Sequence, residues 1–234
     1  MRPWKSATIN LGLAAWAALA WWAARPTLAG GDTVLKLDAD PTGNTTTSVV
    51  SIESCASLAT GGTVMVDIIV ENVTDLLAWD MRISYDPDVL EVTAADTEMF
   101  QAANEGSEVV NLSEETPDSD GLYSLQSVDT ADPPVPDSGS GVLGRLTLKA
   151  KGPGISPLEI AKIDLDGDQA FDQGPFLRDV DGEIIGDEDD DTFFDGPIGG
   201  AEIHVGEGCG GGPVGSTGSE DGGVDAWLLI GSAL

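Results

Sequence analysis

Basic residues are scarce in this chain of 234 residues. Ten lysines and arginines stand against 41 aspartates and glutamates, which gives a formal net charge of -31 at pH 7. Arg2, Lys5 and Arg25 belong to the first 29 residues, which contain no acid, so the remaining chain is more acidic still. Such a chain repels nucleic acid and anionic membranes, because each phosphate would add repulsion instead of releasing counterions. Nucleic-acid binding is therefore excluded, and the acidity is typical of secreted or salt-adapted proteins.

The chain also has little that could support catalysis. Its only histidine, His204, is expected on the outward side of the last strand, and neither cysteine has a histidine placed to activate it. No G-x-S-x-G nucleophile elbow occurs. Two carboxylates can hydrolyse glycosides, but among 41 acids no pair stands out. We predict that the protein is not an enzyme.

Cysteine is rare, and only Cys55 and Cys209 occur. Two sulfurs this far apart in the sequence do not make a metal site, which needs closely spaced ligands. In an oxidising compartment they can close one large loop instead. We predict a disulfide between them, with two free thiols as the alternative. The bridge requires the first and last strands of the domain to be neighbours.

The first 29 residues have the pattern of a secretory signal peptide. M-R-P-W-K carries two positive charges, an apolar run spans residues 7–24, and small residues precede a cleavage point after Ala29. We therefore predict cleavage at that point and a secreted or cell-surface protein. The alternative is an uncleaved anchor, because the apolar run approaches the ~20 residues that span a bilayer.

Sustained helical periodicity is missing after the leader, and strand patterns take its place. Residues 63–70 and 78–85 place apolar side chains on one side with period two, as half-buried strands require. In the second segment the core side carries Trp79, Met81, Ile83 and Tyr85, and the open side carries Ala78, Asp80, Arg82 and Ser84. Further short strands follow, separated by Gly, Pro, Asp and Ser. The sequence predicts an all-β fold, an antiparallel sandwich.

Composition also predicts the domain organisation. Residues 1–29 are the signal peptide, 30–48 a linker or loop with a short strand, and 49–206 the sandwich. Residues 207–223 are a linker rich in glycine and serine. Residues 224–234 are apolar but too few to span a bilayer. We interpret this end either as a surface anchor cut short, which would attach the protein to the cell envelope, or as a disordered tail.

Two segments carry a family resemblance. Residues 72–92 read N-V-T-D-L-L-A-W-D-M-R-I-S-Y-D-P-D-V-L-E-V, and residues 139–154 read G-S-G-V-L-G-R-L-T-L-K-A-K-G-P-G. Together they resemble the cohesin family of bacterial secreted modules, and the resemblance covers residues 49–206. It implies a jelly-roll β-sandwich of about nine strands. It also implies a module without catalysis that recognises dockerins, small calcium-loaded domains fused to polysaccharide-degrading enzymes.

The resemblance implies a binding surface on one sheet face. Family members use an aspartate a few residues before Tyr-Asp-Pro, and Asp80 matches that position. We predict that Asp80, Arg82 and Ser84 bind the partner. Leu125 and Ser127, from the next strands, are predicted to lie on the same face and to bind the partner as well. The alternative is that Asp80 only solvates an exposed strand.

Two other functions stay open beside dockerin binding. Residues 116–141 and 164–195 are richer in Asp, Pro or Ser than the family pattern, which leaves the partner's identity undecided. A polysaccharide is one alternative ligand, because cohesin-like sandwiches resemble some carbohydrate-binding modules in fold. Flat sugar binding typically needs exposed aromatics. Of the six tryptophans, only Trp79 lies outside the leader and the tail, and it is expected in the core. The other alternative is a structural surface spacer.

The stretch I-D-L-D-G-D-Q-A-F-D (163–172) invites comparison with a calcium loop. An EF-hand loop needs glycine at its sixth position and an acid at its twelfth, but counting from Asp164 these positions are Gln169 and Pro175. The stretch is therefore not an EF-hand. Calcium is still expected to relieve the repulsion among carboxylates on adjacent turns. The predicted ligands are Asp164, Asp166, Asp168, Asp179 and Asp181, and the alternative is a solvated acidic loop without bound calcium.

Overall fold

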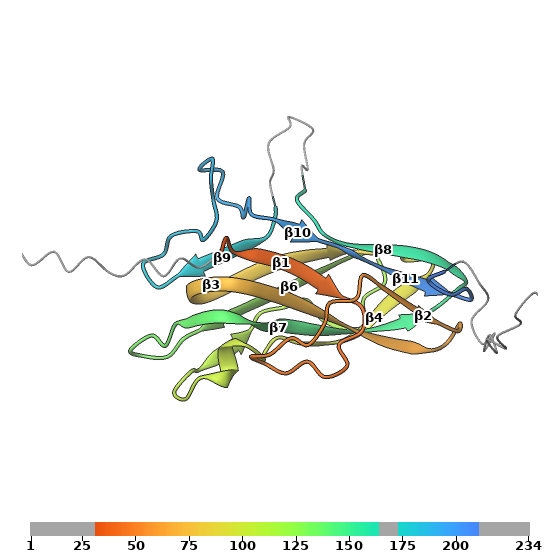
Figure 1. Ribbon diagram of the computed structural model, residues 1–234, viewed down its shortest axis with the longest axis horizontal. Coiled ribbons are helices and arrows are strands. Elements are labelled where there is room, and N and C mark those ends of the chain that lie inside the picture. The colour runs from red at the N-terminus through yellow and green to blue at the C-terminus, as the bar shows by residue number, and fades with distance from the viewer. Residues whose placement is uncertain (1–30, 164–172, 211–234) are drawn as a thin grey trace, which may run out of the picture. The chain divides into compact units, whose positions relative to one another are not determined.

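A computed structural model describes residues 31–163 and 173–210, and nearly all regular structure in these ranges is β-strand (Figure 1). One short 3-10 helix, η1 (Gln101–Ala103), is present. No helix among the described residues is long and apolar enough to cross a membrane. The all-β prediction is confirmed. The strands are β1 Val34–Asp38, β2 Cys55–Leu58, β3 Thr63–Ser84, β4 Leu90–Asp96, β5 Val109–Asn111, β6 Leu122–Asp129, β7 Asp137–Ala150, β8 Gly154–Ile160, β9 Phe176–Asp179, β10 Ile198–Gly199 and β11 Ala201–Val205.

The longest strand, β3, is shared by two sheets. Its first half, residues 63–70, pairs with β1 on one edge and with β7 on the other. Its second half, residues 76–84, pairs with β6 on one edge and with β9 and then β8 on the other. The register with β7 shifts between Val70 and Leu76, where the two halves join. One continuous strand therefore connects the two layers of the fold.

The junction in β3 depends on two residues in the left-handed backbone region. Asn72 and Asp75 have φ values of 57° and 54°, a conformation that Asn and Asp tolerate better than most residues. Their backbone N–H groups donate to the Oγ atoms of Ser140, at 3.0 Å, and Ser138, at 2.8 Å. The serine side chains thus replace hydrogen bonds that the irregular ladder cannot supply.

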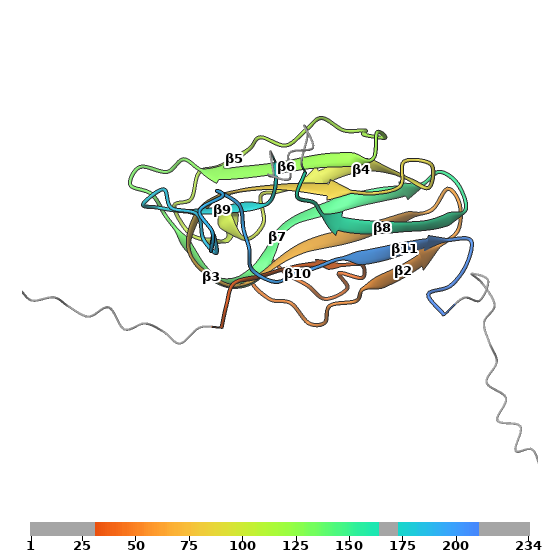
Figure 2. The same cartoon turned by 90° about the horizontal axis from the view of Figure 1, so that it is seen from above.

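The two sheets form a sandwich, which is predominantly antiparallel as predicted (Figure 2). The first sheet has the order β10-β1-β3-β7-β4. The second has β5 and β6 on one side of β3, β9 and β8 on the other, and β11 and β2 beyond β8. Two pairs, β1 with β10 and β2 with β11, are parallel. Only Gly200 separates β10 from β11, so this stretch leaves one sheet and enters the other.

The core lies between the two sheets and follows the alternation expected for β3. Trp79, Met81, Ile83 and Tyr85 are 1%, 0%, 1% and 6% exposed, which confirms their predicted burial. They belong to one cluster with aliphatic residues of β1, β4, β6, β7, β8, β9 and β11. Full burial of one such aliphatic or aromatic side chain contributes roughly 1.5–3 kcal/mol. Contacts among strands distant in sequence therefore supply most of the stability.

A buried ion pair ties the outer side of the first sheet together. Asp67 of β3 is fully buried, and it accepts two hydrogen bonds from Arg145 of β7, at 2.6 and 2.9 Å. Asn44 donates to Asp67 and to the equally buried Asp38 of β1. Asp38 also accepts from the backbone N–H of Glu53. These bonds fasten the segment between β1 and β2 onto the sheet.

The strand expected within residues 30–48 is present as β1, and it is an integral part of the sandwich. It pairs along its whole length with β3 and also with β10. The predicted signal peptide, the predicted linker from residue 211 onward and the apolar C-terminal segment lie outside the described residues.

The predicted disulfide between Cys55 and Cys209 is confirmed, with the two Cα atoms 6.1 Å apart. Cys55 begins β2, which pairs with the last strand, β11, as the bridge requires. The bond links residues that are 154 positions apart and so closes a loop around almost the entire sandwich.

Removing this bond should lower the free energy of unfolding by about 5 kcal/mol, because a loop of this length strongly restricts the unfolded chain in the entropic model. Urea unfolding of the Cys55→Ala, Cys209→Ala variant against the oxidised wild type measures the loss. Reduced wild type is the matched control and should unfold at nearly the same urea concentration as the variant. A loss below about 1 kcal/mol would contradict the expectation.

Candidate functional site

The second sheet presents an outward face formed by β5, β6, the second half of β3, and β9 (Figure 2). We call it the β5–β6–β3–β9 face. Its residues are set by register, since directly paired residues point to the same side of a sheet. Asp80 lies between Gln126 of β6 and Phe176 of β9. The outward residues are Val110 on β5, Ser124, Gln126 and Val128 on β6, Ala78, Asp80, Arg82 and Ser84 on β3, and Phe176 and Arg178 on β9.

Three of the five residues predicted to bind a partner lie on this face, and two do not. Asp80, Arg82 and Ser84 alternate with the core residues of β3, as expected. Leu125 and Ser127 are 0% and 2% exposed and face the core, so their predicted placement on the open face was wrong. The reason is register: they pair with the core residues of β3, which the sequence of β6 alone does not reveal.

A polar network occupies the centre of the face. Arg82 donates through Nη1 to Asp80 Oδ1, and Gln126 donates through Nε2 to Asp80 Oδ2. Arg82 Nε also donates to Gln173 Oε1, at 3.3 Å. Burial raises the pKa of Asp80, while Arg82 and Gln126 oppose that shift. The network holds Asp80 in one position with its charge balanced, although its side chain is only 9% exposed.

Aliphatic side chains lie at the β5 side of the same face. Val110 is 39% exposed and pairs with Val128 of β6. Leu112, just beyond β5, is 56% exposed and donates its backbone N–H to the carbonyl of Gln126. The sequence indicated a strand at V-V-N-L (109–112) but did not lead us to predict that its apolar side chains are exposed. The available signal was a short strand with apolar residues that did not follow the alternation of core strands.

The residues predicted to bind calcium are only partly described. Asp164, Asp166 and Asp168 lie outside the described residues. Asp179 stabilises the turn that follows it, because its Oδ1 accepts the backbone N–H groups of Asp181 and Glu183, both at 2.9 Å. The described pair thus shapes the turn after β9, and its share in a calcium site stays a prediction.

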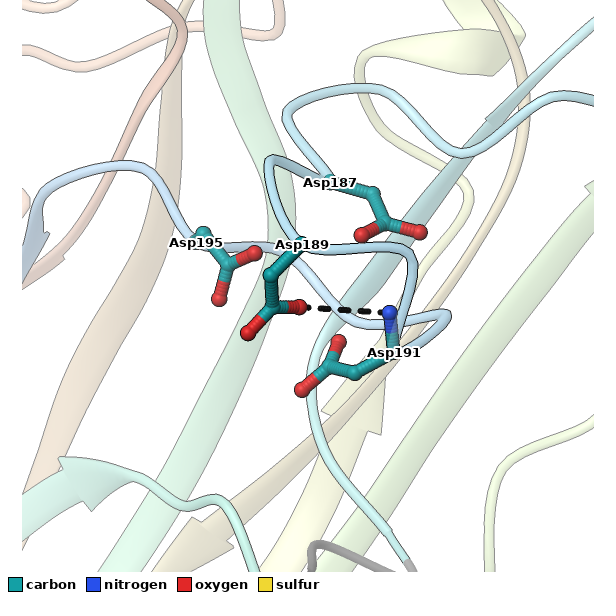
Figure 3. Close-up of side chains that lie close together, drawn as sticks. All are labelled: Asp187, Asp189, Asp191 and Asp195. Carbon is teal, nitrogen blue, oxygen red and sulfur yellow. Dashed lines mark hydrogen bonds between the residues drawn. The ribbon is translucent and has the colours of Figure 1, made fainter.

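The structure brings together a different group of acids. Asp187, Asp189, Asp191 and Asp195 each offer a carboxylate oxygen within 4.8 Å of the others (Figure 3). Lys162 Nζ lies 2.5 Å from Asp195 and 4.0 Å from Asp191. Its hydrogen bond lowers the pKa of Asp195. The cluster therefore consists of four carboxylates beside the ammonium group of Lys162. The sequence signal for this cluster was the alternation of aspartates at positions 187, 189 and 191.

His204 is less accessible than the sequence suggested. It alternates with the core residues Ile203 and Val205, as expected for the outward side, but it is only 7% exposed. Its Nε2 lies 3.1 Å from Glu202 Oε2. Both cysteines are in the disulfide, so neither is available as a nucleophile.

A family model described as "Cohesin domain" matches residues 48–174. No protein with a curated description matches the chain. Among solved structures, a non-cellulosomal cohesin from the hyperthermophilic archaeon Archaeoglobus fulgidus is similar, with 15% identity, a TM-score of 0.46, and coverage of 74% of this chain and 91% of that chain. A type II cohesin domain from the cellulosome of Acetivibrio cellulolyticus has 14% identity, a TM-score of 0.49, and coverage of 74% and 95%. A chain of a type I cohesin–dockerin complex from Clostridium thermocellum has 13% identity, a TM-score of 0.45, and coverage of 74% and 99%.

Replacing Arg82 by methionine should destabilise the protein by about 3 kcal/mol at pH 7, because Asp80 would keep a nearly buried charge without its cation. The same loss should raise the pKa of Asp80 further. A carboxyl with a raised folded-state pKa binds a proton more readily when folded, so the deficit should be small near pH 4 and grow as the pH rises. Urea unfolding across this pH range measures it.

The control for this experiment is Arg178→Met on the neighbouring strand. Arg178 is exposed, donates to the carbonyl of Gly182 and lies over the Phe176 ring, so its loss should cost less than about 1 kcal/mol at every pH. A pH-independent deficit in the Arg82 variant would contradict the role assigned to Asp80.

Proposed function

Because this chain belongs to the cohesin family, with a family model matching more than half of it, we propose that the sandwich is a non-catalytic module that binds a dockerin-like protein partner. The partner docks on the β5–β6–β3–β9 face. The observation that carries the proposal is the composition of this face, which combines a fixed polar centre with exposed aliphatic residues at one side. Protein interfaces commonly combine such features.

The physical argument rests on what each part contributes to binding. Leu112 and Val110 offer apolar surface that a partner can remove from water. Asp80 is already hydrogen-bonded and largely buried in the free protein, so little side-chain entropy is lost when a partner contacts it. Arg82 and Gln126 keep donor groups beside it, and these can align a polar partner group.

We propose further that the module acts outside the cell, in the assembly or surface display of polysaccharide-degrading proteins. The predicted signal peptide supports export, and the Cys55–Cys209 disulfide fits an oxidising compartment. The apolar C-terminal segment would supply attachment to the envelope. Dockerin-bearing enzymes would then be held at the surface by this module.

Direct carbohydrate binding is the alternative, and the burial of the described aromatic side chains disfavours it. A flat sugar site needs exposed rings, but Trp79, Tyr85 and Tyr123 are all buried. Within residues 31–163 and 173–210, no aromatic side chain is classed as exposed. The third candidate function, a structural spacer, does not require a charge-balanced polar network on an outward sheet face. Protein recognition therefore accounts for more of what the face contains.

The binding test uses Leu112→Asp, which places a charge in the apolar part of the face. We expect it to weaken dockerin binding at least about tenfold, or about 1.4 kcal/mol, because an interface residue would keep an unpaired charge. The control is Met65→Asp, since Met65 is 48% exposed on the first half of β3, within the other sheet. Isothermal titration of both variants and wild type against a panel of dockerin modules and soluble glucans measures the effect. Glucan binding without dockerin binding would overturn the assignment.

Calcium binding by the late acidic segment is a separate proposal, which rests on the density of carboxylates there. Added calcium should raise the melting temperature of the wild type, and EDTA should reverse the rise. In the Asp166→Asn, Asp168→Asn variant the rise should be smaller, because two of the proposed ligands lose their charge. A melting temperature that responds to neither reagent would remove the proposal. The other proposed ligands are Asp164, Asp179 and Asp181.

A further inference from the structure

Two buried carboxyl groups at one end of the sandwich have oxygens without partners. Asp129 ends β6 and is 3% exposed, and Asp137 begins β7 and is 2% exposed. One oxygen of each is satisfied. Asp129 Oδ1 accepts the N–H groups of Glu108 and Ala131, both at 2.9 Å, and Asp137 Oδ1 accepts from Asn104 Nδ2 at 2.6 Å. The second oxygen, Oδ2, is buried in both residues and has no hydrogen-bond partner.

A third oxygen without a partner belongs to Gln101, whose side chain reaches the part of β3 with which the ends of β6 and β7 pair. Gln101 of η1 is 1% exposed, and its Nε2 donates to the carbonyl of Leu77 at 2.7 Å. Its Oε1 is buried without a partner. Leaving such groups unsatisfied is costly, so three of them in one region indicate that the folded protein holds something there.

The strand register places these three residues in the same region. Asp137 pairs with Leu76 on β3, and Val128, which precedes Asp129, pairs with Ala78. Leu77, which accepts the hydrogen bond from Gln101, lies between those two pairing positions. This is the point where β6 and β7 leave the same edge of β3 for different sheets (Figure 2). The three residues therefore lie where the two sheets separate.

The charge of this group is not balanced by the protein. Burial and then the neighbouring charge of Asp129 raise the pKa of Asp137 to about 7, and no cationic group contributes to that shift. Arg82 and Arg145, by contrast, are ion-paired with Asp80 and Asp67. Two buried carboxylates close enough to repel each other require a proton or a cation between them.

We propose that Asp129, Asp137 and Gln101 form an internal binding site for a calcium ion. The donors are all oxygens, which suits a hard cation, and one divalent ion balances both carboxylates. The ligands are Asp129 Oδ2, Asp137 Oδ2 and Gln101 Oε1. A fourth ligand is the Oγ of Ser107, which is also buried without a partner and is next in sequence to Glu108, whose N–H binds Asp129. This site is distinct from the acidic segment that contains Asp187 and its neighbours.

The site has a consequence for the neighbouring binding face, although it does not depend on the proposed function. Asp129 Oδ1 holds the N–H of Glu108, the residue immediately before β5. A cation that fixes Asp129 therefore also fixes the start of β5, which carries Val110. Binding of calcium would stiffen the edge of the β5–β6–β3–β9 face.

Terbium, a luminescent substitute for calcium, tests the site. Trp79 pairs with Ser127, two residues before Asp129, so excitation of tryptophan should sensitise emission from bound terbium. We expect sensitised emission from full-length wild type at pH 8, and calcium should compete it away. Emission should be lost when Asp137→Asn is added to the Asp166→Asn, Asp168→Asn variant, in which the separately proposed late acidic site is weakened. Asp137→Asn keeps an oxygen to accept from Asn104 and removes only the charge. The Gln101→Met variant should bind terbium at least about tenfold more weakly.

Two controls separate this site from other acids. Glu105→Gln changes an exposed carboxylate next to Asn104 and should retain full emission. The Asp166→Asn, Asp168→Asn variant should retain it as well. Circular dichroism checks the fold of each variant, and Asp129→Asn serves as a second charge-removing variant if Asp137→Asn does not fold.

Two outcomes would overturn the site. The first is sensitised emission that survives when Asp129→Asn or Asp137→Asn is combined with Asp166→Asn and Asp168→Asn. The second is wild type without calcium-competed emission at pH 8, which would mean that the pair is neutralised by a shared proton. Because the readout is metal binding, neither outcome bears on whether a dockerin binds the face.

Discussion

The fold depends on one constraint, the shared membership of β3 in both sheets. The strand changes sheets where Asn72 and Asp75 adopt left-handed backbone conformations and two serines of β7 satisfy the freed N–H groups. The directions in which the later side chains of β3 point depend on the geometry of this junction. The second half of β3 carries Asp80 outward and Trp79 inward. The ends of β6 and β7 that carry Asp129 and Asp137 separate at the same place.

Three groups of buried carboxyls show three ways of handling charge in one acidic protein. Asp67 is neutralised by a bidentate arginine and has a structural role, since it also accepts a hydrogen bond from Asn44 in the segment after β1. Asp80 is neutralised by an arginine on its own strand, at the surface where a partner can reach it. Among the described residues, Asp129 and Asp137 accept hydrogen bonds from uncharged groups only, and their negative charges repel each other. A chain with few basic residues cannot pair every buried acid, so the unpaired acids are where an external cation is most useful.

Sequence alternation was enough to predict the fold class, the core side of β3 and the placement of Asp80, because period-two burial is a local property of a strand. The Cys55–Cys209 bridge could be predicted because only two cysteines were available. Leu125 and Ser127 were misplaced because the facing of β6 depends on its register with β3, which is set by contacts between distant segments. The gathering of Gln101, Asp129 and Asp137 could not be predicted for the same reason, since nothing local links η1 to the ends of β6 and β7.

The parallel pairing of β2 with β11 has a mechanical consequence. A load applied to the chain beyond Cys209 does not peel β11 from its neighbours one hydrogen bond at a time. The disulfide passes the load directly into Cys55, at the start of β2. Because the bond closes a covalent loop from Cys55 to Cys209, tension from the C-terminal side reaches the residues before Cys55 without extending the strands between the two cysteines. A module attached through that end could therefore transmit force while its binding face stays folded.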